Sequence, residues 1–236
     1  MRYYLVIPAA GSGRRLAATI PKQYAELGAA TVIEHALAPF EADADCAGIV
    51  VAIAPNDATW PLISARRPRA IEVAAGGAER AHSVLSALRT LATRARPDDW
   101  VMVHDAARPC FTRADLERLK LELAGDDVGG LLAMPLADTL KRGAAGVDRP
   151  FVEATLDRAG LWRAATPQVF RLGLLRDALD AALAVGKLPT DEAQAMEWAG
   201  HAPRLIAGRT DNIKVTTADD LALARAIIAS RTGEQV

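Results

Sequence analysis

The sequence has little of several features that mark other protein classes, and each absence excludes something. It has only two cysteines, Cys46 and Cys110, which form no C-x-x-C pair. This argues against a disulfide framework and a zinc site, and it is typical of a reducing cytoplasm. The chain begins without a signal-peptide apolar segment, and no stretch approaches the ~20 apolar residues of a membrane span. We therefore expect a cytoplasmic protein with no membrane association.

A strong charge of one sign is also missing. The formal net charge is −1 and there is no strongly basic block, so nucleic-acid binding is not expected as the main activity. With 236 residues, of which 51% are hydrophobic and 24% charged, the chain has ample material for a core. This composition predicts a single globular domain over residues 1–236. Positive charge that matters for function should then be local.

Short apolar runs are present at regular intervals along the chain. They cover residues 3–7, 48–53, 70–73, 100–103 and 130–134. Continuous apolar runs of this length are typical of strands that are buried on both faces, as in a parallel sheet.

Segments with helical spacing lie between and after these runs. Apolar stripes or helical segments cover residues 32–37, 84–91, 116–123, 172–185, 191–199 and 219–229. Thr112 with Asp115, and Thr217 with Asp220, have the spacing of capping boxes that begin two of the helices. The alternation predicts an α/β fold, doubly wound and Rossmann-like, with a mostly parallel twisted sheet and helices on both faces.

The alternation breaks after residue 134. From about 135 to 160 the chain is polar, contains Gly143 and Gly146, and has strand character only at 151–155. This stretch is too long for an ordinary loop, so it predicts an extended β-arm that leaves the domain. An arm needs a surface to rest on, and a homodimer with exchanged arms would provide one. A disordered surface insertion is the alternative.

The loop after the first strand combines small residues with positive charge. It has the sequence Pro8-Ala-Ala-Gly-Ser-Gly-Arg-Arg-Leu16, followed by Pro21-Lys-Gln23. Small residues let the backbone approach a ligand, and its N–H groups together with arginine and lysine favour a polyphosphate. Leu16 stands where a dinucleotide fingerprint needs glycine, and no Gly-Lys-Ser/Thr is present, so both common nucleotide loops are excluded. A tight turn with solvated arginines is the alternative.

A second polar loop, residues 76–83, follows the strand at 70–73. Paired glycines there would let the backbone read the edge of a base, and Ser83 would lie in the first turn of the next helix. A plain turn with Arg80 on the surface is the alternative.

Two further polar loops carry Asp105, Arg108 and Lys214. Asp105 directly follows the strand at 100–103, where a carboxylate can bind Mg²⁺ or ribose hydroxyls, and Arg108 can meet a phosphate. Lys214 lies between two apolar residues, an unusual place for a lysine that is merely solvated. The alternatives are a simple Asp105–Arg108 ion pair and a lysine on an edge strand.

Ligands of open α/β sheets bind at the carboxyl ends of the strands, where these loops should meet. Together the loops supply Arg15, Lys22, Arg108 and Lys214 with one strand-end carboxylate. There is no plausible serine–histidine–acid set or activated cysteine. Several cations, backbone amides and one acid suit phosphoryl or nucleotidyl transfer, which depends on positioning and charge neutralisation with Mg²⁺.

The ordered motifs resemble one enzyme family over residues 5–223. The matching segments are 8–16 and 21–23 above, Val103-His-Asp-Ala-Ala-Arg-Pro109, Asp138-Thr139, Thr166-Pro-Gln168 and Asp211-Asn-Ile-Lys-Val-Thr216. They are similar to the 2-C-methyl-D-erythritol 4-phosphate cytidylyltransferases of isoprenoid precursor biosynthesis, which have a nucleotidyltransferase fold. The resemblance implies transfer of CMP from CTP to methylerythritol 4-phosphate, with Mg²⁺ and release of pyrophosphate. The substrate phosphate would attack the α-phosphorus in line, without a covalent enzyme intermediate.

The resemblance also implies roles for individual residues. The implied catalytic residues are Arg15, Lys22, Arg158 and Lys214. The implied nucleotide-binding residues are Ala9, Ala10, Gly11, Gly13, Arg15, Lys22, Gly77, Ser83 and Asp105. The implied acceptor-binding residues are Asp105, Arg108, Thr139, Arg158, Thr166 and Lys214. Asp105 would be a minor Mg²⁺ ligand beside the CTP phosphates. Thr139 and Arg158, on the arm of a homodimer, would reach the neighbouring subunit's site.

One position departs from the family pattern: some relatives carry a base-reading acid where this chain has Ala78. Cytosine selection would then rest on backbone groups. Two alternatives to the implied function are a cytidylyltransferase for another alditol phosphate, such as ribitol 5-phosphate, and a noncatalytic nucleotide-binding regulatory subunit.

Overall fold

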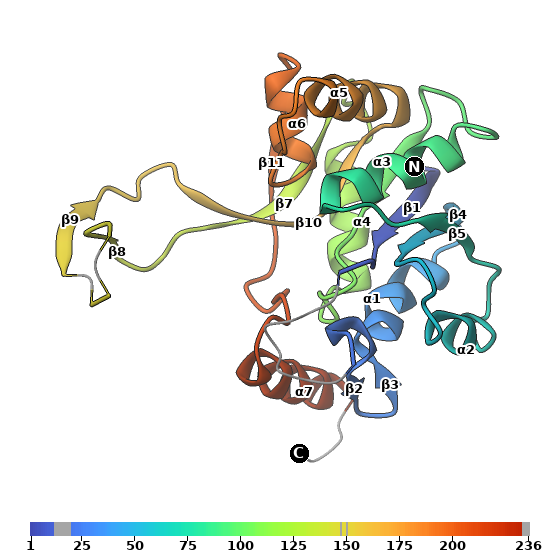
Figure 1. Ribbon diagram of the computed structural model, residues 1–236, viewed down its shortest axis with the longest axis horizontal. Coiled ribbons are helices and arrows are strands. Elements are labelled where there is room, and N and C mark those ends of the chain that lie inside the picture. The colour runs from blue at the N-terminus through green and yellow to red at the C-terminus, as the bar shows by residue number, and fades with distance from the viewer. Residues whose placement is uncertain (12–19, 147, 150, 233–236) are drawn as a thin grey trace.

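A computed structural model of the chain describes residues 1–11, 20–146, 148–149 and 151–232, and a seven-stranded sheet forms its centre (Figure 1). The strand order is β11-β7-β10-β6-β1-β4-β5. Its strands are β1 (Tyr3–Pro8), β4 (Cys46–Ile53), β5 (Glu72–Ala75), β6 (Trp100–Val103), β7 (Gly129–Pro135), β10 (Trp162–Arg171) and β11 (Arg204–Ala207). Every strand except β10 runs in the same direction, because β10 alone pairs antiparallel with its neighbours β6 and β7. The predicted mostly parallel sheet is confirmed.

Helices cover both faces of the sheet, as predicted. On one face, α1 (Val32–Glu41), α2 (Trp60–Ser64) and α4 (Arg113–Glu122) share a buried apolar cluster with Tyr3, Leu5 and Ile7 of β1. On the other face, α3 (Arg80–Leu91), α5 (Leu172–Ala184) and α6 (Glu192–Trp198) form a second cluster around Val6. Successive residues of a strand point to opposite faces, and both faces are apolar here, so β1 reads as an unbroken apolar run.

The last helix, α7 (Ala218–Thr232), packs away from the main sheet. It lies beside the short hairpin of β2 (Glu26–Leu27) and β3 (Ala30–Thr31), which follows a 3-10 turn, η2 (Lys22–Tyr24) (Figure 1). Ala224 of α7 and Leu27 of β2 belong to a third apolar cluster. The expected capping contacts are present: the hydroxyl of Thr112 accepts from the Asp115 N–H at 3.2 Å, and that of Thr217 from the Asp220 N–H at 3.3 Å.

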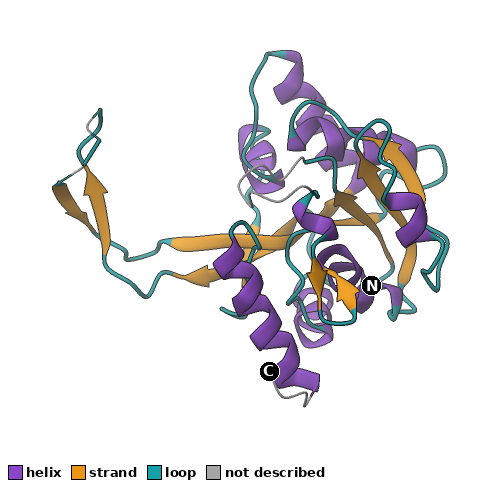
Figure 2. Cartoon of the chain, turned by 60° about the horizontal axis from the view of Figure 1, so that its bottom comes forward, coloured by secondary structure: helices purple, strands orange, loops and turns teal. Residues whose placement is uncertain are grey.

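The segment between β7 and β10 extends far from the body of the protein (Figures 1 and 2). It contains an antiparallel hairpin of β8 (Leu140–Gly143) and β9 (Val152–Leu156). β7 and β10 remain paired as far as Pro135 and Trp162, so the segment begins at the end of one strand and returns to the start of its neighbour. Phe151 is 68% exposed on the hairpin, although it is a large apolar side chain.

Several strands of the main sheet differ from the sequence-based expectation. β10 and β11 were not predicted, β4 begins two residues earlier and β5 two residues later than expected, and β1 and β7 are slightly longer. β10 contains Arg163, Pro167 and Gln168, and its pairing with β7 is interrupted between Ala164 and Gln168, next to a cis peptide bond at Pro167. A central strand with this many polar residues lacks the apolar run by which the other strands were recognised. No helix within the described ranges is long and apolar enough to cross a membrane.

Candidate active site

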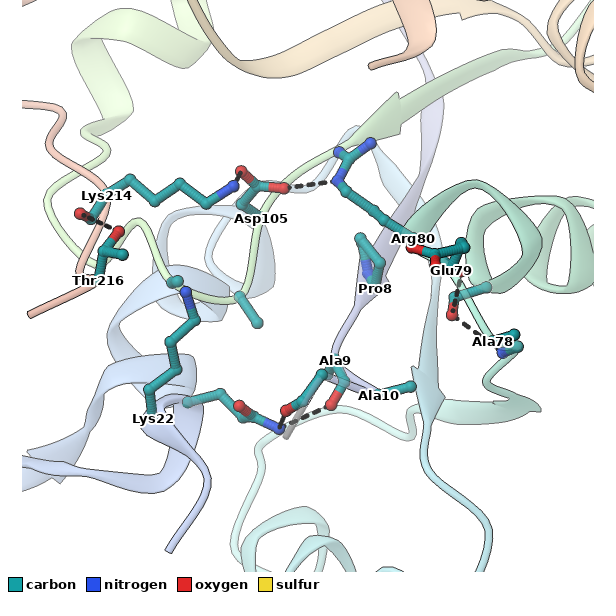
Figure 3. A pocket seen from close by; sticks show the side chains of 16 residues that line it. Pro8, Ala9, Ala10, Lys22, Ala78, Glu79, Arg80, Asp105, Lys214 and Thr216 are labelled. Atoms are coloured by element: carbon teal, nitrogen blue, oxygen red, sulfur yellow. Dashed lines mark hydrogen bonds and ion pairs between the residues drawn. The ribbon is translucent and has the colours of Figure 1, made fainter. Parts of the chain in front are cut away.

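A cavity of about 500 Å³ lies at the carboxyl ends of β1, β5 and β6 (Figure 3). This is the edge at which open α/β sheets bind ligands. Its lining comes from all four of the polar loops identified in the sequence: Pro8, Ala9, Ala10, Gly11, Lys22, Gln23, Gly77, Ala78, Glu79, Arg80, Ser83, Asp105, Ala106, Ala107, Lys214 and Thr216. The structure therefore brings together loops as far apart in the chain as those of Pro8 and Thr216.

The first loop presents backbone and one lysine to the cavity. The Gln23 side-chain amide donates to the carbonyl oxygens of Ala9 at 2.7 Å and Gly11 at 3.3 Å, which ties the end of β1 to the turn at Lys22. The Lys22 ammonium donates to the Val215 carbonyl at 3.1 Å, across the cavity from the second loop. Gly13 and Arg15, which were also assigned to this loop, lie outside the described residues.

The second loop packs so closely that two of its positions require glycine. A Cβ on Gly76 would lie 2.2 Å from the Cβ of Ala10, and one on Gly77 would lie 2.3 Å from the Cβ of His82. The Ser83 hydroxyl accepts a hydrogen bond from the Gly77 N–H at 3.0 Å. Ser83 lies in the first turn of α3, as predicted, and fixes the backbone that lines the cavity.

Asp105 lies at the centre of the charged part of the site. One of its oxygens accepts from Arg80 Nε at 3.0 Å, and the other is 2.9 Å from Lys214 Nζ and 3.6 Å from Arg108 Nε. Burial alone would raise the pKa of Asp105, but the attraction of Arg80, Lys214 and Arg108 outweighs it and holds the pKa far below its usual range. Asp105 is therefore ionised, and the simple Asp105–Arg108 pair that was the alternative interpretation is only one part of a larger cluster.

Thr166 and His104 hold the backbone of Asp105 in place. The Thr166 hydroxyl accepts from the Asp105 N–H at 3.0 Å and is 3.0 Å from His104 Nδ1. Burial lowers the pKa of His104 to about 4, so its ring is neutral at pH 7. The other ring nitrogen is 3.2 Å from the Arg108 carbonyl, which can only accept. Nε2 therefore carries the proton, and the Thr166 hydroxyl donates to Nδ1.

Two residues that were assigned to the acceptor lie behind Asp105 and not on the cavity wall. Thr166 is 4% exposed, and both it and Arg108 are absent from the residues that line the cavity. Arg108 donates to the Asn212 carbonyl at 2.8 Å, and the Asn212 side chain donates to the Thr166 carbonyl at 2.9 Å. These bonds join the loops at 104–109 and 208–216 to β10.

Thr139 and Arg158 lie on the extended segment and not at this chain's cavity. Both are exposed, and the Arg158 guanidinium donates to the Ala137 carbonyl within the same segment.

Sequence reasoning assigned no role to four polar residues that line the cavity, Gln23, Glu79, Arg80 and Thr216, nor to the buried Glu192 behind them. Arg80 was read as a surface residue, but its side chain joins Asp105 to Glu192 at the start of α6. Nothing in the sequence pairs these two residues, because they are 112 positions apart. Gln23 lies in the segment Pro21-Lys-Gln23, in which only Lys22 was assigned a role.

The described residues offer a poor protein-only site for Mg²⁺. They contain no group of three or more His, Cys, Asp or Glu side chains arranged to bind a metal ion. Both oxygens of Asp105 already face cations. A divalent ion would therefore depend on oxygens that a bound nucleotide brings with it.

The chain matches a known protein family. Residues 3–230 match the family model described as 2-C-methyl-D-erythritol 4-phosphate cytidylyltransferase. A protein of that name from Pseudomonas entomophila (strain L48) is 54% identical over 220 residues, which cover 93% of this chain and 92% of that protein.

Solved structures are similar over almost the whole chain. A crystal structure of 4-diphosphocytidyl-2C-methyl-D-erythritol synthase is 39% identical, with a TM-score of 0.82 over 96% of this chain and 98% of that one. The Francisella tularensis 2-C-methyl-D-erythritol 4-phosphate cytidylyltransferase is 35% identical, with a TM-score of 0.81 over 96% and 100% of the two chains. The family indicated by the sequence motifs is confirmed: the chain belongs to the 2-C-methyl-D-erythritol 4-phosphate cytidylyltransferases.

Proposed function

We propose that this protein transfers CMP from CTP to 2-C-methyl-D-erythritol 4-phosphate and releases pyrophosphate, in isoprenoid precursor biosynthesis. The observation that carries the proposal is the cavity at the strand ends, where Lys22 and Lys214 face small-residue backbone and the ionised Asp105. Family membership identifies the substrates, and the cavity supplies the groups that such a transfer needs.

The reaction is an in-line displacement. A phosphate oxygen of the acceptor forms a bond to the α-phosphorus of CTP, and the bond from that phosphorus to the bridging oxygen of pyrophosphate breaks. Negative charge shifts towards the leaving pyrophosphate, so fixed cations accelerate the step. We assign Lys22 and Arg15 to the α-phosphate, and Lys214 with Arg158 to the attacking phosphate.

The nucleotide would lie along the first two loops. Ala9, Ala10 and Gly11 line the cavity and would present backbone to the phosphates. Gly77 would contact the base, and Ser83, which holds Gly77 by a hydrogen bond, would also contact the nucleotide. Ala78 has no acid to offer the base, so the backbone around Gly77 would select cytosine. Mg²⁺, when bound, would neutralise the triphosphate charge and would be held mainly by CTP.

We further propose that the protein is a cytoplasmic homodimer. Both cysteines are free and buried, which suits a reducing compartment. The hairpin of β8 and β9 exposes Phe151 and Val152, and burial of these side chains on a second copy would remove apolar surface from water. Thr139 and Arg158 would then complete the partner's site.

A pyrophosphate-release assay tests the function. The protein is supplied with CTP and Mg²⁺, together with methylerythritol 4-phosphate in one series and ribitol 5-phosphate in another. We expect turnover with the first acceptor. Turnover with ribitol 5-phosphate alone would reject the acceptor, and nucleotide binding without turnover on either acceptor would indicate a noncatalytic subunit.

A further inference from the structure

The Arg80 side chain is shared between the active site and a helix that does not line it. Its Nε donates to Asp105 at 3.0 Å, while its two terminal nitrogens lie 2.5 and 3.0 Å from the two carboxylate oxygens of Glu192. All three guanidinium nitrogens therefore donate within the protein. The bidentate contact with Glu192 fixes the plane of the guanidinium, which a single hydrogen bond would leave free to rotate.

Glu192 is itself rigidly held. It is 1% exposed and is the first residue of α6. The start of α6 is fixed to β10 by Gln168, which accepts from the Ala193 N–H at 2.8 Å and donates to Asp191 at 2.9 Å. Asp191 in turn accepts from the Gln194 N–H at 2.9 Å and caps the helix. The carboxylate that faces Arg80 thus has a fixed position relative to the sheet.

Stability alone does not account for this pair. Burial raises the pKa of Glu192 more than the nearby Arg80 lowers it, so the carboxylate is costly to keep at this position. Arg80 is the first residue of α3, and a cation is disfavoured at a helix N-terminus. Apolar side chains of similar size would commonly fill such a space with equal or better stability.

The contact assigns the two oxygens of Asp105 to different cations. Arg80 occupies one oxygen, which leaves the other to Lys214 at the cavity and to Arg108 behind it. We propose that Arg80 is a positioning residue, clamped by Glu192, that sets the orientation of Asp105 and through it the place of Lys214 for the acceptor phosphate. This inference rests on the proposed cytidylyl transfer.

The decisive variant replaces the ion pair by apolar residues, Arg80→Met with Glu192→Leu. The matched control is Arg89→Met with Asp180→Leu, because Arg89 of α3 forms an exposed ion pair with Asp180 of α5 at 2.5 Å. A Glu192→Gln variant, which keeps the side chain's shape, accompanies them in case the double variant fails to fold. Thermal melts and steady-state kinetics with CTP and methylerythritol 4-phosphate are measured for all of them.

We expect the Arg80/Glu192 double variant to fold with a lower melting temperature, because one Asp105 oxygen loses its donor. It should lose about 10- to 100-fold in kcat/KM for the acceptor, the scale of a ~1 Å misplacement. The loss should be larger for the acceptor than for CTP, and Glu192→Gln should show a smaller loss of the same kind. Glu192→Leu should add no further loss in an Arg80→Met background. The control pair should stay within about two-fold of the wild type, since exposed ion pairs contribute little.

Three outcomes are distinguishable. If the wild-type protein shows no turnover with CTP and methylerythritol 4-phosphate, the proposed function itself is rejected. If the wild type is active and the double variant and Glu192→Gln stay within about two-fold of it, the positioning role is overturned. An equal loss in the control pair would overturn it as well.

Discussion

Replacement of Thr166 by valine separates a positioning role for this residue from a direct contact with substrate. Valine is similar in shape but lacks the hydroxyl that accepts from the Asp105 N–H and donates to His104 Nδ1, both at 3.0 Å. A buried polar group left without a partner costs about 1–3 kcal/mol, and two are left here. The extra buried methyl group offsets roughly 1 kcal/mol of this. We expect Thr166→Val to lower the free energy of unfolding by about 1–5 kcal/mol.

Thr166→Ser is the matched control, because it keeps the hydroxyl and removes one buried methyl group, at about 0.5–1.5 kcal/mol. Urea unfolding at constant m-value gives the stabilities, and pyrophosphate release gives kcat/KM. Because the hydroxyl fixes the backbone of Asp105, turnover should fall in the valine variant and persist in the serine variant. If Thr166→Val is as stable and as active as Thr166→Ser, the hydrogen-bonded role assigned to this hydroxyl is wrong.

Three further predictions follow from the charges of the site and the extended arm. The folded-state pKa of His104, about 4, lies below its unfolded value of 6.5, so the free energy of unfolding should fall as the pH drops from 6.5 towards 4. Urea unfolding should show that this free energy is about 2 kcal/mol lower at pH 5 than at pH 7, and His104→Gln should largely remove the difference. Lys22→Ala should cut kcat far more than CTP affinity, because the cation acts on charge that develops during transfer; equal losses in calorimetric affinity and rate would contradict this. Mixed dimers of Arg158→Ala and Lys22→Ala chains should regain part of the activity that each homodimer lacks, and purified heterodimers that remain inactive would exclude a shared site.

The predictable parts of this protein are those in which local pattern and tertiary environment agree. Residues 3–7 and 100–103 are apolar without interruption because helices cover both faces of the sheet there. The apolar run predicts a strand that is buried on both faces, and the fold buries it in that way. Thr112 with Asp115 is a local contact, readable from four residues. The loop positions of Lys22 and Lys214 followed from the rule that ligands lie at strand ends, and both line the cavity.

The parts that could not be predicted depend on contacts between distant segments. β10 contains polar residues because Thr166 holds the backbone of Asp105 and Gln168 holds the start of α6. With these residues, β10 lacks the continuous apolar run that identifies a central strand. Arg80 looks like any solvated arginine in sequence, and only the fold brings Glu192 to it. Site residues of this kind are determined by tertiary structure and not by their neighbours in the chain.

The antiparallel course of β10 has a consequence for how this protein can change over time. Because β7 and β10 are adjacent partners, with Pro135 opposite Trp162, the segment between them is in topological terms an enlarged hairpin loop. Loops of this kind can be lengthened, shortened or exchanged at small entropic cost without a change in strand order. Positions of this segment other than Thr139 and Arg158 can therefore diverge in length and sequence, while Thr166, only a few residues further along the same strand, keeps the backbone of Asp105 in place. The length of the segment and the hydrogen bonds around Asp105 can thus change independently of each other.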